Sequence, residues 1–491
     1  MFSYEKFNAS NIIDAPAVER VVEFSPSGVD AANIARVLSL AVDGKVISAD
    51  AADGYADVAG RVNFRLVYAD RDGVVRGVDY NADFTIKVDG DFVAEDAVSA
   101  AVYVVETDVT AGDSIKLSAV VSVSASALRR TEIEALTDAE RCYKTVETVS
   151  VPSAVAVKSV SVPVSDECEA EEVESVLLVD AQAIVLGAVA EEGKIDVNAS
   201  VFAKVTYVEG GEIKTAEFEI PFAEEVQAED VAEGDAVFAT VAVRSSKIVL
   251  SGVTGANIIR FDGDVALKVY VLRDKEAEVV ADMFMLANEV EMERTQAQFR
   301  CFGKTAYTSE KIHGTASLGD RPEADAVVAV PYARCFVAKA ETAESGATVE
   351  GVLNADVVYT DESGLNSVRA EVPFSLDIDG EFGDGVKAFC VVEKVAAKVR
   401  RGGEIEIDAT VGILLTSYRT ATVEYISSVT LGEEKEQNTS ALSLYIASDG
   451  DEMWDVCKAL TATPEEIMQQ NPSLSTPLAE GERVIFFRSL S

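Results

Sequence analysis

One pattern occurs three times along the chain and constrains its fold more than any other feature. Each copy is an apolar segment that ends in tyrosine, a turn with glycine, a second segment with alternating apolar and polar residues, and a phenylalanine. Glycine turns between alternating segments are typical of antiparallel hairpins. Each copy therefore predicts a β-hairpin whose aromatic side chains have structural roles. The copies are VNFRLVYADRDGVVRGVDYNADF, SVFAKVTYVEGGEIKTAEFEIPF and VLNADVVYTDESGLNSVRAEVPF, with tyrosines Tyr68, Tyr207 and Tyr359 and phenylalanines Phe84, Phe222 and Phe374.

The repeat is long and extends beyond the hairpins. Successive tyrosines are 139 and 152 residues apart, which indicates duplicated domains and excludes an array of short repeats. Thirty residues before each tyrosine stand Leu38, Leu177 and Ala329 in apolar runs. After each hairpin, Gly112, Gly263 and Gly403 are each predicted to form a turn before another strand. The middle copy has about twelve extra residues here, which we expect in a loop around Ser245 to Ile259.

The fold class follows from the density of strand signals. Each unit holds seven or eight runs rich in Val, Ile, Thr, Tyr and Phe, and the one short helical pattern lies around Thr131 to Glu140. We predict a mainly β fold of three tandem antiparallel β-sandwich or barrel-like repeats, followed by a small βααβ domain. The predicted domains are residues 1–138, 139–292, 293–438 and 439–491.

Charge and composition exclude several classes of function. The chain carries 85 acidic and 42 basic residues, and the net charge of −43 is spread along its length. Binding to nucleic acid or to an anionic membrane through a basic face is therefore excluded. A hydrophobic content of 48% is enough for large cores. The most apolar stretch, Val176 to Ala190, is short and contains Asp180, so we expect a buried strand pair there.

The N-terminal residues, the few cysteines and the single histidine constrain the cellular compartment of the protein and the reactions it could catalyse. The start, MFSYEK, lacks the apolar core of a signal peptide, and the six cysteines are at least 26 residues apart, as expected of reduced thiols in a cytosolic protein. The single histidine, His313, is expected at a surface turn. The acidic segment 166–172 lacks the ligand pattern of a calcium loop and is predicted to be a solvated linker. We therefore predict a non-enzymatic protein with no catalytic residues, metal or cofactor.

The pattern changes at Leu444. The sequence LYIASDGDEMWDVCKALTATPEEIMQQNPSLSTPLAEGERVIFFR predicts a strand, a helix over Met453 to Leu460, a second helix capped by Thr463, and a last strand over Arg483 to Phe487. This segment resembles a LysM domain, whose pattern is Y-x-V-x-x-G-D-T-L-W, then N-P after the second helix, then P-G-x-x-L-x-I. In that family, the loops after the first strand and before the last form a groove for N-acetylglucosamine polymers. The groove residues implied here are Gly450, Asp451, Glu452, Met453, Trp454, Asn471 and Pro472.

The segment departs from the LysM pattern at two places: Glu452 replaces the usual threonine or serine, and Ala479-Glu480-Gly481 replaces the usual Pro-Gly turn. The carboxylate of Glu452 and the segment's net charge of −5 disfavour a glycan ligand. In the LysM alignment Tyr445 points inward, which places Leu442, Leu444 and Ile446 on the other side of the strand, where we expect them near Trp454. Such a group of apolar side chains is a candidate protein-docking patch. The alternatives are that this face packs on the third β-repeat or covers Trp454.

Tandem repeats of this type followed by a LysM domain resemble the SPOCS-domain scaffold proteins of endospore-forming bacteria. The third copy matches best, and the first departs by having Asp83 where proline is expected. The resemblance implies a cytoplasmic protein of the mother cell that gathers at the forespore surface and recruits spore coat layers. Its implied partner is the coat-basement ATPase, bound through the LysM domain.

Two other functions are open to a chain of this composition. The alternative is an envelope protein whose LysM domain binds peptidoglycan or another N-acetylglucosamine glycan. A hydrolase with an accessory LysM domain would need a catalytic domain within residues 1–438, and the threefold repeat fills that span.

Overall fold

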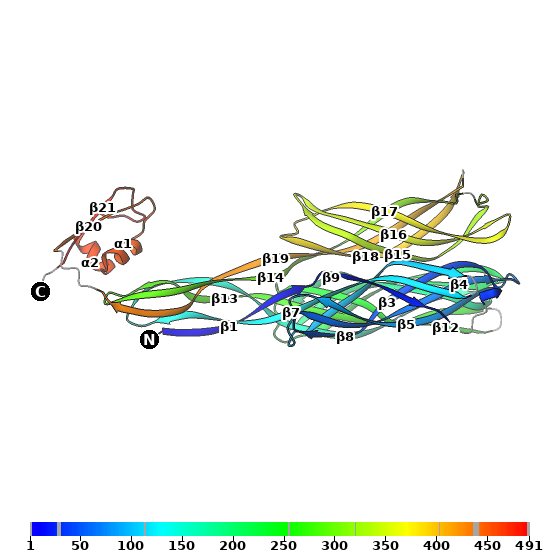
Figure 1. Cartoon of the computed structure of the whole chain (residues 1–491), viewed down its shortest axis with the longest axis horizontal. Coiled ribbons are helices and arrows are strands. Elements are labelled where there is room, and N and C mark those ends of the chain that lie inside the picture. Colours follow the sequence, from blue (N-terminus) through cyan, green and yellow to red (C-terminus); the bar gives the residue numbers. More distant parts are fainter. Residues whose placement is uncertain are drawn as a thin grey trace.

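A computed structural model describes residues 2–26, 31–111, 114–253, 256–319, 321–401, 403–435 and 441–488. The fold is mainly β, as predicted, and the two α-helices lie near the C-terminus. Figure 1 shows an elongated molecule, with three barrel-like bodies at one end, long paired strands reaching to the other, and a small helical module beside the tips of those strands. None of the described helices is long and apolar enough to span a membrane.

Three units with the same strand order build the elongated part. In the first unit, the sheet β3-β4-β5 faces a sheet in which β1, β2 and β6 all pair with β7. The strand β3 lies beside β6, and β2 lies beside β5, so the two sheets close into a barrel-like body. The strands are β1 (Phe2–Asp14), β2 (Val18–Phe24), β3 (Ile34–Ala52), β4 (Tyr55–Asp70), β5 (Val75–Asp89), β6 (Val98–Ala111) and β7 (Ile115–Ala139), with a short 3₁₀ helix at Ala31–Asn33.

The second and third units repeat this order. The second unit consists of β8 (Tyr143–Ala170), β9 (Val173–Glu191), β10 (Lys194–Glu209), β11 (Glu212–Gln227), β12 (Ala236–Val253) and β13 (Ala256–Phe284). The third consists of β14 (Asn288–Ser317), β15 (Ala326–Ala343), β16 (Gly346–Asp361), β17 (Gly364–Asp379), β18 (Gly385–Arg400) and β19 (Glu404–Glu434). Among the described residues, no sheet combines strands of two units. The predicted boundary after residue 292 falls inside β14, because the chain changes sheets between Phe284 and Asn288.

The predicted hairpins are present, and their aromatic residues pack as structural groups. Each tyrosine lies on the central strand of a three-stranded sheet and is buried. Phe374 pairs with Gly351 on the neighbouring strand, and a Cβ placed on Gly351 would lie 2.5 Å from the Phe374 ring. Phe84 covers Gly60 in the same way, whereas Phe222 stands opposite Ala199. The ring thus fills the space that a strand glycine leaves open.

A carboxylate stands two residues after each tyrosine, and in the first and third units it holds the hairpin turn. Asp70 accepts hydrogen bonds from the backbone N–H groups of Asp72 and Val74, and Asp361 accepts one from Ser363. Glu209 is the counterpart in the second unit, where it accepts from the N–H of Glu171 and pairs with Lys214. The pKa of all three carboxyl groups is lowered, mainly by the Val74 N–H at Asp70, by Lys214 at Glu209 and by the Ser363 hydroxyl at Asp361.

The units are not independent, because their long strands form one stalk. Beyond the barrels the pairs β1–β7, β8–β13 and β14–β19 continue as two-stranded ribbons. One buried cluster in the stalk contains Ala9 and Ile133 from the first unit, Val151 from the second, and Phe299 and Val423 from the third. A ribbon of two strands buries too little to be stable alone, so each ribbon depends on the other two.

The barrels also share a core where they meet. Leu38, Leu177 and Ala329, which occupy equivalent repeat positions, belong to one buried cluster. Around it β5 lies beside β9, β11 beside β15, and β17 beside β3, so the three barrels form a ring. Each boundary also has a buried or half-buried polar contact. These contacts are Arg65 to the Val179 carbonyl (2.5 Å), Arg334 to Asp180 (2.5 Å) and Ser39 to Asp356 (2.8 Å).

Several local predictions were wrong. The segment Thr131 to Glu140 is strand up to Ala139, because pairing with β1 overrides its helical pattern. The extra residues of the middle copy lengthen the hairpin β12–β13. The described residues between Ser245 and Ile259 therefore belong mainly to paired strands and do not form the predicted loop. Gly263 likewise lies inside β13 and not in a turn. Val176 to Ala190 belongs to one strand, β9. Gly403 does lie in a turn, whereas Gly112 lies outside the described residues.

The C-terminal module, residues 441–488, has the predicted βααβ order. It consists of β20 (Leu442–Ile446), α1 (Met453–Leu460), α2 (Pro464–Gln470) and β21 (Arg483–Phe487). Thr463 caps α2, and its hydroxyl accepts the N–H of Glu466 at 3.1 Å. The antiparallel strands β20 and β21 pair directly, and both helices pack beneath them on the module core.

Candidate functional site

The sheet of the C-terminal module has one buried face and one exposed face. Strand alternation points Tyr445, Val484 and Phe486 toward the module core. The opposite side, which we call the outer face, carries five large apolar side chains that are between 40% and 60% exposed. These residues are Leu442, Leu444, Ile446, Ile485 and Phe487.

Cross-strand pairing makes the outer face continuous. Leu442 stands opposite Phe487, and Leu444 stands opposite Ile485. Directly opposed residues of an antiparallel pair project on the same side with Cβ atoms about 5 Å apart. Ile446 extends the row and stands opposite Arg483, whose side chain adds a positive charge at one end. Within the described residues, nothing in the hydrophobic clusters covers this face.

Trp454 is not part of the outer face, contrary to the sequence-based prediction. Its indole lies on α1 in the same apolar cluster as Tyr445, on the buried side of β20. The ring packs edge-on against Phe284 at the end of β13, with ring centroids 5.1 Å apart. Phe284 in turn stacks on Tyr143 at the start of β8. The module therefore docks on the stalk tip of the second unit through α1, whereas one alternative from the sequence was that the outer face packs on the third unit.

Asp282 is the polar centre of this docking contact. It accepts hydrogen bonds from Trp454 Nε1 at 2.9 Å and from Lys458 Nζ at 2.7 Å, and Arg294 lies 3.2 Å away. Burial opposes ionisation of Asp282, but the hydrogen bonds from Lys458 and Trp454 outweigh it and lower the pKa of this carboxyl group. We call Trp454, Lys458, Asp282 and Phe284 the stalk clamp.

The loop after β20, predicted to contribute to a groove, is fixed by internal hydrogen bonds. The Asp451 carboxylate accepts from the Tyr445 hydroxyl at 2.7 Å and from the Ser448 N–H at 2.8 Å. The Tyr445 contact is the main cause of a lowered Asp451 pKa and raises the pKa of Tyr445 to about 12. The Leu478 N–H donates to the Asp451 carbonyl at 2.7 Å, which joins the two loops. Gly450 adopts the left-handed conformation that glycine favours, with φ of 86°.

The remaining predicted groove residues divide between structural and exposed positions. Asn471 exchanges hydrogen bonds with the backbone of Ile485, at 2.7 and 3.0 Å, and so ties α2 to β21. Glu452 is exposed just before α1, and its N–H donates to the Asp455 carboxylate at 2.9 Å. Met453 is half-buried on the module core, and Pro472 is exposed.

The structure thus separates the predicted residues into an outer face, a stalk clamp and a loop region. Sequence reasoning missed Ile485 and Phe487, although the alternation in Arg483-Val484-Ile485-Phe486-Phe487 was a usable signal. It also missed Asp282, Phe284 and Lys458. No sequence signal connects Asp282 with Trp454, because 172 residues separate them.

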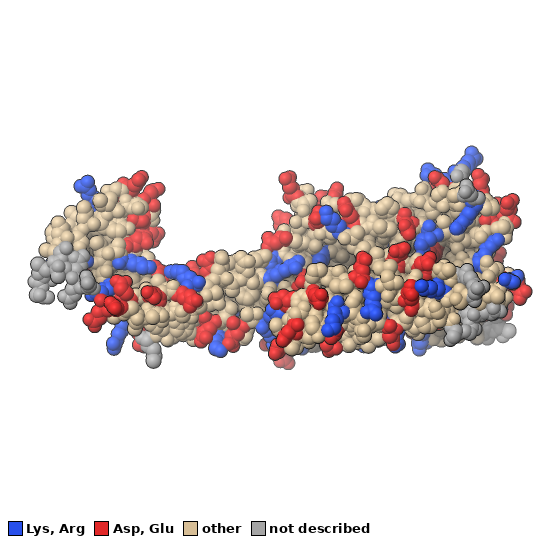
Figure 2. All heavy atoms as spheres, in the orientation of Figure 1, with Lys and Arg blue, Asp and Glu red and all other residues tan. Residues whose placement is uncertain are grey.

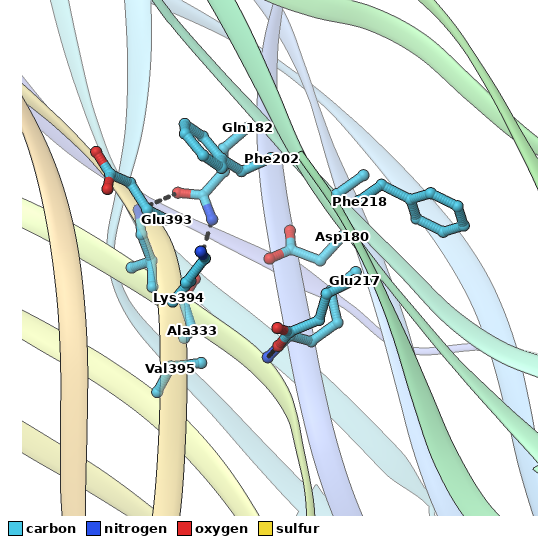
Figure 3. A pocket seen from close by; sticks show the side chains of 12 residues that line it. Asp180, Gln182, Phe202, Glu217, Phe218, Ala333, Glu393, Lys394 and Val395 are labelled. Carbon is cyan, nitrogen blue, oxygen red and sulfur yellow. Dashed lines mark hydrogen bonds and ion pairs between the residues drawn. The ribbon is translucent and has the colours of Figure 1, made fainter. Parts of the chain in front are cut away.

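Elsewhere, polar groups at the unit boundaries have structural partners. A cavity of about 30 Å³ lies between the second and third units, where Gln182 bridges the Ala333 carbonyl and the Val392 N–H, both at 3.2 Å (Figure 3).

His313 lies within β14, where its Nδ1 stands 2.5 Å from the Asp408 carboxylate, and is not a turn residue. Residues 166–170 belong to β8, so most of the predicted linker is strand.

On the face that Figure 2 shows, acidic side chains lie along most of the molecule's length, with lysine and arginine scattered among them. Among the described residues, no group of three or more His, Cys, Asp or Glu side chains is arranged so that it could hold a metal ion.

The fold and the site define a repetitive β protein with a small α/β module that presents an apolar face. Residues 172–250 match the family model of the SPOCS domain of SipL, so this segment of the chain is similar to a SPOCS domain. The matched segment spans β9, β10, β11 and most of β12 in the second unit. SPOCS domains are associated with sporulation proteins of the spore coat. No significant match was found among curated proteins or solved structures.

Proposed function

We propose that this protein is a non-enzymatic scaffold of spore coat assembly. In this proposal the LysM-like module docks through its outer face onto the coat-basement ATPase, while the three β units hold the module at the end of a rod. The protein acts in the mother-cell cytoplasm, at the forespore surface. The observation that carries the proposal is the row of five exposed apolar side chains on β20 and β21.

The outer face has the properties of a protein-docking surface. Monomeric proteins rarely expose large contiguous apolar patches, and those that do mostly use them for recognition. Phe487 is 60% exposed and is flanked by the aliphatic side chains of Leu442 and Ile485, so a partner could bury an aromatic anchor surrounded by apolar groups. The stalk clamp lies on the opposite side of the module, so docking on the stalk leaves the outer face accessible.

Charge supports the same assignment. An acidic surface discourages non-specific association of the rods with each other and with nucleic acid. Specific contacts must therefore come from the few apolar patches. On the module, Arg483 lies at one end of the outer face and adds a possible pairing point for an acidic group of the partner.

The test is a binding assay between the full chain and the purified coat-basement ATPase. Ile446→Arg and Phe487→Arg place charges on the outer face and are expected to reduce binding at least tenfold. Val189→Arg is the matched control, because Val189 is as exposed as Ile446 but lies on β9. Unchanged binding by both outer-face variants would refute docking through this face.

A second candidate is binding to peptidoglycan or a related glycan. It is favoured by the fixed loop at Gly450 and Asp451, which is joined to the opposite loop through Leu478. Sedimentation of the full chain with insoluble peptidoglycan tests it. Retention on the glycan, together with no affinity for the coat protein, would favour this function over the scaffold role.

A further inference from the structure

The third barrel contains two thiols on adjacent strands. Cys335 lies on β15 and Cys390 on β18, two strands that lie side by side although they belong to different sheets. Cys390 is buried in the barrel core, and Cys335 packs against the same cluster. Cys390 is near enough to Cys335 to contribute to the raised pKa of the Cys335 thiol. The thiols therefore meet at the seam where the two sheets close the barrel.

Equivalent positions in the other two units show that side chains at this place face one another. Gly44 is the counterpart of Cys335, because their partners Val62 and Leu353 both stand six residues before a repeat tyrosine. Val102 is the counterpart of Cys390, since each stands two residues before the bulge of its strand. A Cβ placed on Gly44 would lie 2.5 Å from Cγ1 of Val102.

In the second unit the corresponding residues are Ala183, which is buried in the core of that barrel, and Val241, which is partly buried and packs against the same core. The seam position thus holds a glycine and a valine in the first unit, an alanine and a valine in the second, and two cysteines in the third. Side chains that meet so closely across a seam have the separation that a disulfide requires, with Cβ atoms roughly 4 Å apart.

A small oxidant can reach one of the thiols. Cys335 lines a hollow of about 60 Å³ between β6 of the first unit and strands β15, β16 and β17 of the third. A single water molecule needs about 10–15 Å³ of such space, so a molecule as small as hydrogen peroxide fits here.

The geometry points to a modification site: Cys335 and Cys390 form an intramolecular disulfide when the protein meets hydrogen peroxide. The Cys335 thiolate attacks one peroxide oxygen, the O–O bond breaks, and hydroxide leaves, which gives a sulfenic acid. The Cys390 sulfur then attacks the Cys335 sulfur, forms the S–S bond and displaces the hydroxyl group as water. In total, two thiols lose two protons and two electrons, and one peroxide becomes two waters.

The surroundings determine how fast this step is. Burial, and secondarily the Cys390 thiol, raise the pKa of Cys335 well above that of a free cysteine. Because the thiolate is the reactive form, oxidation is slow at neutral pH. Its rate rises about tenfold for each unit by which the pH is increased, until the pH reaches the thiol pKa. The pair is thus suited to a durable cross-link and not to rapid redox sensing. The bond would staple two sheets across a loop of 55 residues.

The experiment oxidises the reduced full chain with hydrogen peroxide at pH 8. Remaining thiols are alkylated after denaturation, and the peptides are mapped by mass spectrometry. We expect Cys335 and Cys390 to be joined within one chain and protected from alkylation. The cross-linked protein should also show a Tm higher by a few degrees, an increase that reduction reverses.

Variants separate this site from general oxidation. Cys335→Ala and Cys390→Ala should each leave the other thiol without a cross-link, whereas Cys301→Ala, a buried thiol in the stalk, should leave the cross-link intact. The proposal is overturned if both thiols are still alkylated at a peroxide concentration that oxidises Cys168, which is half-buried in the second unit. It is also overturned if the cysteines join only different chains.

Discussion

The indole nitrogen of Trp454 donates a 2.9 Å hydrogen bond to the carboxylate of Asp282, across the boundary between the C-terminal module and the stalk. The ring also packs edge-on against Phe284, which is buried in the module's own apolar cluster. A residue of the stalk therefore completes the core of the module. Because these contacts fix the orientation of α1, they also fix the direction in which the outer face points.

Asp282→Ala should weaken the docking of the module on the stalk and loosen the packing around Trp454. The substitution removes the acceptor of Trp454 and Lys458 and leaves the indole N–H without its partner, a loss of roughly 1–3 kcal/mol of docking free energy. Trp454 is the only tryptophan, so its fluorescence reports on this contact directly. We expect a red-shifted emission and stronger quenching by acrylamide.

The control for this variant is Asp274→Ala. Asp274 also forms an ion pair in the stalk, with Arg419 at 2.6 Å, but far from the module. Its substitution should leave the tryptophan emission unchanged. An Asp282→Ala protein with the emission and quenching of the unmodified chain would contradict the clamp.

Acid should open the same contact. The pKa of Asp282 is lowered in the folded protein from its ordinary value of 3.8, so its contribution to docking is complete above about pH 4 and is lost as the pH falls through the folded pKa. Tryptophan emission followed from pH 7 to pH 2 should therefore stay constant down to about pH 4 and then shift to the red. In Asp282→Ala the emission should already be shifted at pH 7, and this acid step should be absent.

The acid response of the rod should have the same sign. Asp70, Glu209 and Asp361 also have lowered pKa values in the folded state, so the stability they contribute is present above about pH 4.5 and is lost toward lower pH. Asp361→Ala should lower Tm at pH 7 and reduce the dependence of Tm on pH below 4.5. Glu362→Ala, at an adjacent turn position, is the matched control. Equal Tm profiles for the two variants would show that the turn carboxylate has no special role.

The parts of the fold that the sequence predicts are those set by local chemistry. Hairpins at Asp72-Gly73 and Gly210-Gly211 need only glycine in the left-handed region and alternating flanks, and both signals are short-range. The helices of the C-terminal module follow from their caps and from Pro464. The alternation of β20 likewise places Leu444 outside and Tyr445 inside, as observed.

The parts that the sequence does not predict depend on contacts between distant segments. Nothing near Ala9, Val151 or Phe299 indicates that their strands meet in one stalk. The helical period around Thr131 is real, but pairing with β1 determines the structure there. The sequence places Trp454 near the outer face, whereas it contacts Asp282 and Phe284 of the stalk. These partners lie in another unit, so no local pattern indicates the contact.

The contact between Phe374 and Gly351 predicts a strict size limit on the central strand of the third unit. Gly351→Ala places a Cβ 2.5 Å from the Phe374 ring and 2.4 Å from the Phe336 carbonyl, so the ring must move or the strands must separate. Overpacking of this kind costs about 1–3 kcal/mol of unfolding free energy. Chemical denaturation of the full chain would measure it.

Gly187→Ala is the control for that substitution. Gly187 also lies within a strand, β9, but no atom stands within 4 Å of the position that a Cβ would take. This variant should be neutral or slightly stabilising, because alanine restricts the unfolded chain more than glycine does. If both variants had the same stability, the ring-over-glycine packing would not be a constraint on the fold.

The shared cluster at Leu38, Leu177 and Ala329 makes a prediction about cooperativity. If the three units were independent, Leu38→Ala would destabilise only the first unit and would split the unfolding transition. Because Leu38 is 1% exposed in a cluster that all three units build, its truncation should cost about 2–5 kcal/mol and shift one common transition. Differential scanning calorimetry distinguishes these outcomes, and Leu250→Ala, on the exposed hairpin of β12, is the control. A separate low-temperature transition in Leu38→Ala would mean that the barrels unfold singly, and the rod would then be a chain of beads and not one rigid body.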